Sequence, residues 1–348
     1  MQEFDRQASR HPYRSQVRTP PDALSGDALV SALARGWQVT VASMVYRPVG
    51  FGSHHWEIID AEGTRWFVTA DELQTKRHSL REPLNAAFDR LRAPLAAARN
   101  LRDYGHTFVV APVPTLDGEP LARANDRFAV ALYPFVAGES FPWGEFSAPG
   151  HRRAVLDLII AVHTAPSTAR RHAMTDDFMV PHRDELEAAL DPAADIGDCG
   201  PYARATSALL AENAAPIRRQ LARYDKIVMA SRAQPSRTVL THGEPHPGNT
   251  MLTSEGWRLI DWDTALLAPP ERDLWIPLRD PGDGSILGAY AEATGVRPLP
   301  SMLELYRMRW NLADIAIDVS RFRKHHVGSL DDDKSWDVLR SLIAHMGA

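Results

Sequence analysis

The sequence lacks several features that would indicate whole classes of protein. It has a single cysteine, Cys199, which excludes an internal disulfide and a cysteine-rich zinc module. It has no basic surplus, because 39 Lys and Arg stand against 44 Asp and Glu, and this argues against a nucleic-acid partner. Its most apolar helical stretch, residues 154–165, is too short to span a bilayer and contains Asp157 and His163. The N-terminal residues have no apolar core of a signal peptide, so we expect a cytoplasmic protein with no membrane partner.

What is present is an ordinary globular composition over a long chain. The 348 residues are 44% hydrophobic and 24% charged, with a formal net charge of -5. A chain of this length buries a large core and often divides into two lobes. We expect an N-terminal arm (1–21), a small lobe (22–137) and a larger helical lobe (138–348), as a monomer or a homodimer.

The first part of the chain alternates strand-like runs with turns. A short helix is expected at 22–36 and an Ala- and Leu-rich helix at 83–104. The strand-like runs lie at 37–45, 56–59, 66–68, 108–110 and 127–135. Glycine-bearing turns between the first three runs are typical of an antiparallel meander. Three strands, a helix and two strands is the order found in the small lobe of protein kinases.

Helical spacing prevails after residue 138, except in an island at 238–275 that gathers polar residues. A strand there leads into a loop with Glu244 and Asn249, and a short hairpin follows and ends at Asp261. Phosphoryl transfer needs a carboxylate that accepts the substrate proton, and an Asn and an Asp that hold Mg²⁺. In protein kinases the carboxylate precedes the Asn by five residues, and a separate Asp follows a hairpin. The island repeats this spacing.

The sequence of the island resembles the aminoglycoside phosphotransferase family more closely than it resembles the protein kinases. The matching segments are His242-Gly243-Glu244, Asn249, Ile260-Asp261-Trp262, Pro270 and Asp273-Leu274-Trp275. The segment from Trp262 to Trp275 is most similar to the spectinomycin phosphotransferase branch. The resemblance implies an α+β, protein-kinase-like fold of two lobes. The small lobe would hold a five-stranded antiparallel sheet and one helix, and the mainly helical large lobe would carry an inserted catalytic β-hairpin.

The resemblance also implies a role for each matching residue. Glu244 would be the catalytic carboxylate, Asn249 and Asp261 the Mg²⁺ ligands, and His242 and Asp273 supports of the loop. The nucleotide would meet a glycine turn and a hinge, formed by Gly50, Gly52, Ser53, His54, Tyr133, Phe135 and Val136. The acceptor would meet Asp263, Trp275, Asp314 and Asp318. A solvated helix face explains the last two somewhat better than an acceptor site does. Trp275 fits the core or the wall of the substrate pocket, and Tyr133 and Phe135 fit the core as well as they fit the hinge.

The sequence departs from the family pattern in its catalytic acid and in its phosphate-binding cation. Glu244 stands where the family has Asp, with one methylene more and the same acid–base chemistry. Thr69 stands near the place of the lysine that binds phosphate, and Pro94 falls near the place of its glutamate partner. Candidates to replace that lysine are His54, His55, Lys76 and Arg77.

We therefore expect an Mg²⁺-dependent phosphotransferase that uses ATP or GTP. Its partner would be a small natural-product antibiotic with a hydroxyl group, of the aminocyclitol, aminoglycoside or nucleoside type, and phosphorylation would inactivate it. Two alternatives remain open at this point: a kinase-like binding protein that has lost catalysis, and a metabolic small-molecule kinase.

Overall fold

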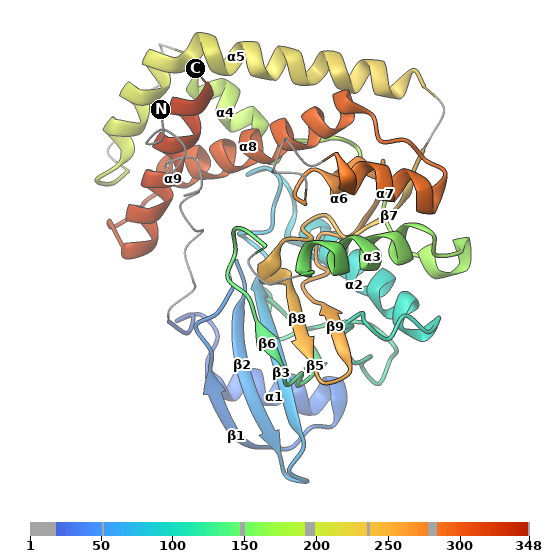
Figure 1. The fold of residues 1–348 in the computed structure, drawn as a ribbon. Helices are drawn as coiled ribbons and strands as arrows, with labels where there is room; N and C mark the ends of the chain where they lie inside the picture. The colour runs from blue at the N-terminus through green and yellow to red at the C-terminus, as the bar shows by residue number, and fades with distance from the viewer. Residues whose placement is uncertain are drawn as a thin grey trace.

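The chain folds into a β-sheet lobe, at the bottom of Figure 1, and a helical lobe, at the top. This computed structural model describes residues 19–50, 52–146, 150–191, 199–234, 237–277 and 284–346. The expected N-terminal arm therefore lies almost wholly outside the described residues.

The small lobe is built on one five-stranded sheet, which confirms the expected fold class. Its elements are α1 (Gly26–Trp37), β1 (Val41–Tyr46), β2 (His54–Asp60), β3 (Arg65–Glu72), α2 (Leu84–Asp103), β4 (Ala122–Arg123) and β5 (Phe128–Pro134). The strand order is β1-β2-β3-β5-β4, and all of these neighbours pair antiparallel.

One predicted strand of this sheet is wrong. The run at 108–110 does not join the five strands; Val109 forms an isolated bridge to Leu259 in the other lobe. The backbone bonds explain this, since Val110 N donates to Leu259 O at 3.1 Å and Leu259 N donates to Phe108 O at 2.9 Å. The short β4 takes the edge of the sheet instead.

The two faces of the sheet are covered by different helices, α1 and α2, which agree with the helical spacing at 22–36 and 83–104 and are one more than the resemblance implies. Val68 and Ala70 of β3 pack with Leu29 and Leu33 of α1 on the outer face. On the inner face, α2 packs against β5 and against residues of the large lobe. Because side chains alternate along a strand, Thr69 and Asp71 face inward, toward the large lobe.

The large lobe is mainly helical, with a small sheet inserted at its junction with the first lobe. Its helices are α3 (His151–His163), η1 (Ser167–Arg170), α4 (Arg183–Ala189), α5 (Ala203–Arg232), η2 (Pro247–Asn249), α6 (Glu271–Leu274), α7 (Ser285–Thr294), α8 (Pro300–Phe322) and α9 (Leu330–Met346). Its strands are β6 (Glu139–Ser140), β7 (Val239–Thr241), β8 (Thr250–Thr253), β9 (Gly256–Leu259) and β10 (Leu266–Ala268). Strands β8 and β9 form the expected hairpin, and β6 pairs with β8, while β7 pairs with β10. No helix in the described part of the chain is long and apolar enough to cross a membrane.

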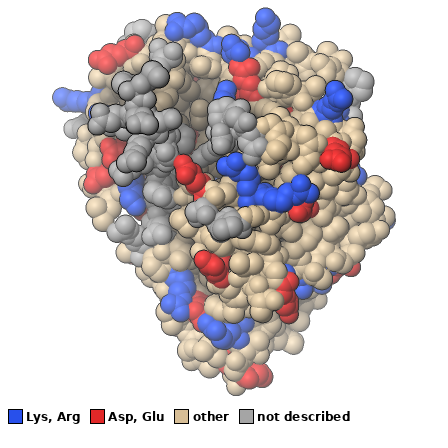
Figure 2. Space-filling view, in the orientation of Figure 1, with Lys and Arg blue, Asp and Glu red and all other residues tan. Residues whose placement is uncertain are grey.

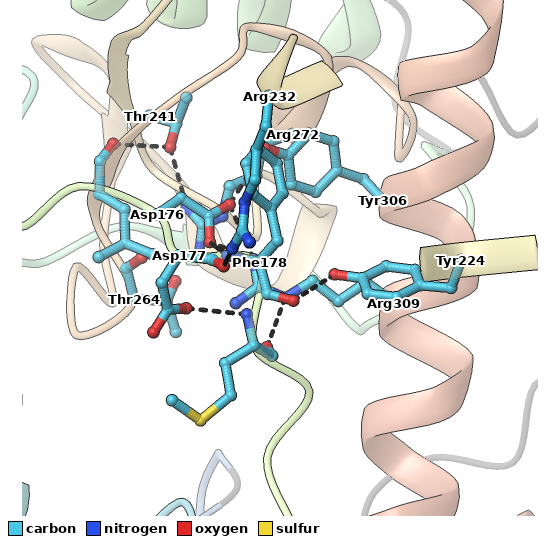
Figure 3. Close-up of polar contacts among 12 residues, drawn as sticks. Asp176, Asp177, Phe178, Tyr224, Arg232, Thr241, Thr264, Arg272, Tyr306 and Arg309 are labelled. Atoms are coloured by element: carbon cyan, nitrogen blue, oxygen red, sulfur yellow. Dashed lines mark hydrogen bonds and ion pairs between the residues drawn. The ribbon is translucent and has the colours of Figure 1, made fainter. Parts of the chain in front are cut away.

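A buried ion pair joins the segment before α4 to the long helix α8 (Figure 3). Arg309 Nη1 lies 2.8 Å from both carboxylate oxygens of Asp176, and Tyr306 donates its hydroxyl to the same carboxylate at 3.0 Å. Tyr224 of α5 donates to the carbonyl of Phe178 at 2.6 Å. Burial would raise the pKa of Asp176, but Arg309 and Arg272 outweigh it and hold that pKa below its usual value.

Removal of the arginine should therefore destabilise the large lobe. Arg309→Met leaves the Asp176 carboxylate buried without its cation, and this typically costs about 3–5 kcal/mol. We expect that loss in the free energy of unfolding measured in urea. Arg307→Met changes an exposed arginine on the same helix and should have little effect. Equal stabilities of the two variants would contradict the role given to the ion pair.

Candidate active site

The loop between β7 and η2 is held by one buried carboxylate of α6. Asp273 accepts the backbone N–H of His242 at 2.7 Å and that of Gly243 at 2.6 Å. It also lies 3.0 Å from His163 Nε2, whose other ring nitrogen pairs with Tyr290 at 2.9 Å. Burial would raise the pKa of Asp273, but His163 and Arg272 hold it below its usual value. Asp273 therefore stays charged and fixes the start of the loop.

His242 links this loop to the hairpin. Its Nδ1 accepts the N–H of Glu244 at 3.2 Å, and its Nε2 donates to the carbonyl of Ile260 at 2.8 Å. Burial lowers the pKa of His242, so the ring is neutral at pH 7, as one donor and one acceptor nitrogen require. His242 thus occupies a supporting position, as the resemblance implies.

Gly243 has no room for a side chain. Its φ is +102°, and a Cβ there would lie 2.5 Å from the guanidinium nitrogens of Arg272. Arg272 is itself fixed, because it donates to Thr241 Oγ1 at 2.9 Å and to the carbonyl of Thr264 at 2.8 Å. Thr264 in turn donates to the carbonyl of His242 at 2.9 Å. Sequence reasoning missed Arg272, because nothing local marks an arginine that packs against a glycine 29 positions earlier.

Asn249 brings the catalytic loop and the hairpin together. Its Nδ2 donates to the carbonyl of Glu244 at 3.0 Å, and its own carbonyl accepts the N–H of Ile260 at 2.9 Å. Asp261 follows with a left-handed backbone, at φ +62°. Burial, Asp263 and Glu244 raise the pKa of Asp261 well above its usual value. Protein atoms surround this residue closely, yet its accessible surface is that of an exposed side chain, so solvent in the cleft reaches it.

Lys76 is the cation among these carboxylates. Its Nζ lies 2.9 Å from Asp71 Oδ1 and 3.0 Å from Asp263 Oδ2. Ser53 of the glycine turn donates its hydroxyl to Asp71 at 2.5 Å. Burial would lower the pKa of Lys76, but the charges of Asp71 and Asp263 outweigh it and raise that pKa. Asp71 was missed in the sequence, although its spacing of two from Thr69 places both on one strand face.

The glycine turn has the backbone that its residues predict. Gly50 and Gly52 have φ values of +70° and +74°, which favour glycine. His54, however, does not join Ser53 at the site. It lies on the α1 face of β2, where its ring neighbours those of Tyr46, Trp56 and Phe128. This placement speaks against the expected contact of His54 with phosphate.

The expected hinge residues lie at the junction of the two lobes. Tyr133 packs into the cluster shared by α2 and the large lobe, and burial raises the pKa of its hydroxyl well above the usual value. Phe135 lies under the Arg65 guanidinium at 3.7 Å and donates its N–H to the Arg65 carbonyl at 3.3 Å. Val136 follows, half-buried. A contact of these residues with a nucleobase stays a prediction.

The residues expected at the acceptor are spread more widely. Asp263 is at the site, paired with Lys76. Trp275 belongs to the apolar core of the large lobe, and its ring centroid lies 5.5 Å from that of Trp310. This is the core position that the sequence offers as an alternative to an acceptor contact. Asp318 is buried on α8, one turn after Asp314. An acceptor role for Asp314 and Asp318 stays a prediction.

The donor groups fit a magnesium ion that is shared with a ligand. Asn249 uses its amide nitrogen on the carbonyl of Glu244, which leaves Oδ1 as its atom for a cation, and the exposed carboxylate of Asp261 is a second donor that a cation could use. Within the described residues, no three His, Cys, Asp or Glu side chains form a complete metal site. Mg²⁺ is usually held by one or two carboxylates together with substrate phosphates and water, so a sparse donor set suits it.

The close fit at Gly243 gives a testable prediction. Gly243→Ala combines an unfavourable φ with a clash, and we expect the free energy of unfolding to fall by at least about 1 kcal/mol. Gly118→Ala is the matched control, because Gly118 has a φ of +83° and open space around it. Urea unfolding of both variants should show the larger loss at residue 243. Similar losses would mean that Arg272 makes room.

Comparisons with known proteins show the family of the chain. The pattern of the Phosphotransferase enzyme family (APH) matches residues 57–306. Protein StrN of Streptomyces griseus is 34% identical over 254 residues, which cover 69% of this chain and 72% of StrN.

Solved structures share the fold at low sequence identity. Spectinomycin phosphotransferase APH(9)-Ia, in complex with ADP and spectinomycin, matches with a TM-score of 0.64 and 18% identity, over 92% of this chain and 97% of that one. Amicoumacin kinase hAmiN, in complex with AMP-PNP, Ca²⁺ and Ami, matches with a TM-score of 0.55 and 13% identity, over 92% and 93% of the two chains. The chain belongs to the phosphotransferase enzyme family and is a kinase-like enzyme that acts on hydroxyl groups.

Proposed function

We propose that this phosphotransferase moves the γ-phosphoryl group of ATP or GTP, with Mg²⁺, to a hydroxyl of a small natural-product antibiotic. The observation that carries the proposal is the joint fixation of Glu244, Asn249 and Asp261. One loop, clamped by Asp273, and one hairpin hold these three residues together. The similar structures that hold spectinomycin or amicoumacin with a nucleotide support the choice of acceptor class. A cytoplasmic location and a monomeric or dimeric state belong to the same proposal.

Glu244 is the residue that handles the proton. The acceptor hydroxyl would bond its carboxylate, the hydroxyl oxygen would attack the γ-phosphorus, and the bond to the β-phosphate oxygen would break. The proton passes to Glu244, and the nucleoside diphosphate leaves. Catalysis of this kind is mainly positioning and charge stabilisation, so a rigid loop matters more than a strong base.

The longer side chain of Glu244 has a defined setting. Its Oε2 lies 3.8 Å from His246 Nε2, and Pro245 and Pro247 restrict the backbone on either side. Glu244 is half-buried and so still open to the cleft. A glutamate here can therefore take the part of the aspartate that the family pattern has.

Asn249 and Asp261 would hold the metal. When bound, Mg²⁺ neutralises the charge that builds up on the transferred phosphoryl group and its leaving oxygen. Asn249 would contribute Oδ1 and Asp261 its carboxylate, and the bond from the Ile260 N–H to the carbonyl of Asn249, at 2.9 Å, ties their two segments together. The negative charges of Asp263 and Glu244 help to raise the pKa of Asp261, and a bound cation would relieve this repulsion.

The first test of the proposal is a search for the acceptor. Purified protein with Mg²⁺ and ATP or GTP is incubated with aminocyclitols, aminoglycosides, nucleoside antibiotics and amino alcohols. We expect one class of antibiotic to gain the mass of a single phosphate. Phosphorylation of amino alcohols alone would favour the metabolic kinase, and no product with any of the antibiotics would contradict the proposed acceptor class.

Substitution of the catalytic carboxylate should remove turnover without loss of the fold. Glu244→Gln cannot accept the proton, and we expect kcat to fall by about 10²- to 10⁴-fold, as for other general bases. Glu244→Asp keeps the carboxylate and should lose much less. Glu255→Gln, on the exposed turn of the adjacent hairpin, is the control and should be unaffected. Full activity of Glu244→Gln would disprove the assignment.

Asp261→Asn separates activity from stability. It removes a crowded charge, so in EDTA we expect its Tm to rise, by roughly 1–2 °C per kcal/mol of repulsion relieved in a chain of this length. The same variant should lose phosphoryl transfer and the stabilisation that Mg²⁺ with nucleotide gives the native protein. Differential scanning calorimetry with and without Mg²⁺ checks both effects. A lower Tm in EDTA, or an unchanged response to Mg²⁺ and nucleotide, would contradict the metal role.

A further inference from the structure

The segment after β3 is a strap that touches both lobes. We use this name for residues 73–83, which run from the end of the sheet toward the helical lobe (Figure 1). The N–H of His182, just before α4, donates to the carbonyl of His78 at 2.7 Å. Glu185 of α4 accepts the N–H of Leu80 at 2.8 Å. The strap is thus docked on the large lobe, although it belongs to the small one by sequence.

Helix α2 fixes the same strap from the other side. Arg90 donates to the carbonyl of Lys76 at 2.7 Å and to Glu82 Oε2 at 2.7 Å. Glu82 also accepts the N–H of His78 at 2.6 Å. These bonds hold the backbone on both sides of Lys76, so its side chain starts from a defined point.

The ammonium group of Lys76 has capacity left for a ligand. An ammonium has three N–H donors, and two of them are directed to Asp71 and Asp263. The remaining neighbour, Ser53 Oγ, is 3.4 Å away, a long contact in comparison. The side chain is 20% exposed, and Gly52 and Ser53 of the glycine turn are among its neighbours.

The other candidates for a phosphate-binding cation fail on position or charge. His54 lies on the opposite face of the sheet, against Phe128. His55 is buried against Phe67, and burial lowers its pKa to about 4, so it carries no charge at pH 7. Arg77 donates to the carbonyls of Leu80 and Glu82 and so holds the strap in shape.

We propose that Lys76, presented by the strap, is the residue that binds the nucleotide phosphates, in place of a lysine on β3. In this arrangement the strand β3 contributes the carboxylate, Asp71, and the lysine that pairs with it comes from a loop held by both lobes. This assignment rests on the proposed function, since it needs a nucleoside triphosphate in the cleft.

Binding measurements test the assignment without knowledge of the acceptor. Mg·ATP and Mg·GTP are titrated into the full chain by calorimetry, and the nucleoside of whichever binds is titrated in parallel. Lys76→Met should lose about 10- to 100-fold in triphosphate affinity, the size of a charge-assisted hydrogen bond, and keep its nucleoside affinity. Lys76→Arg should lose less, because it keeps the charge. The chain has four lysines, and Lys226→Met, on an exposed site of α5, is the matched control.

The outcomes separate the two proposals. Unchanged triphosphate affinity in Lys76→Met would overturn the assignment of Lys76 alone. Equal losses for triphosphate and nucleoside would also overturn it, because they would show a structural role. A native protein that binds neither Mg·ATP nor Mg·GTP would instead overturn the proposed function, and the Lys76 assignment with it.

Discussion

The catalytic geometry of this protein depends on one buried carboxylate, Asp273. It accepts two consecutive backbone N–H groups of the loop and meets a histidine from α3. Three segments that are distant in sequence are thereby fixed at one point. Since an unpaired buried charge is costly, the loop and α3 must both be in place before this part of the lobe is stable. The rigid loop that positions Glu244 is the result.

The site combines this rigid support with several carboxylates placed close together. Asp263 and Glu244 lie close enough to disfavour the charge of Asp261, and Lys76 opposes them. Such an arrangement is unfavourable for folding and favourable for a ligand that carries both signs of charge, as the proposed Mg²⁺ and nucleotide would. The modest net charge of the chain, -5, says nothing of this local contrast, and the face drawn in Figure 2 shows Lys and Arg interspersed with Asp and Glu.

The sequence predicts what is local and misses what depends on the path of the chain. Glu244, Asn249 and Asp261 lie within 18 positions, so spacing alone suggests that they meet. The contact of Lys76 with Asp263 spans 187 positions and depends on where the strap docks. Alternation shows that His54 and His55 face opposite ways, but only the packing of α1 decides which one faces outward. Likewise, the apolar run at 108–110 has strand character, but the sequence does not show that its pairing partner is Leu259 of the large lobe.

The strap also limits how the two lobes can move. Two bodies joined by one short connection can swing about many axes. Here the chain crosses near Val136, and the strap adds a second attachment at α4 through His182 and Glu185. The bridge between Val109 and Leu259 and the packing of α2 against the large lobe add further attachments. A motion that separates the glycine turn from the loop at Glu244 must break some of these contacts, so the relative position of the two lobes is more restricted than a single connection would leave it.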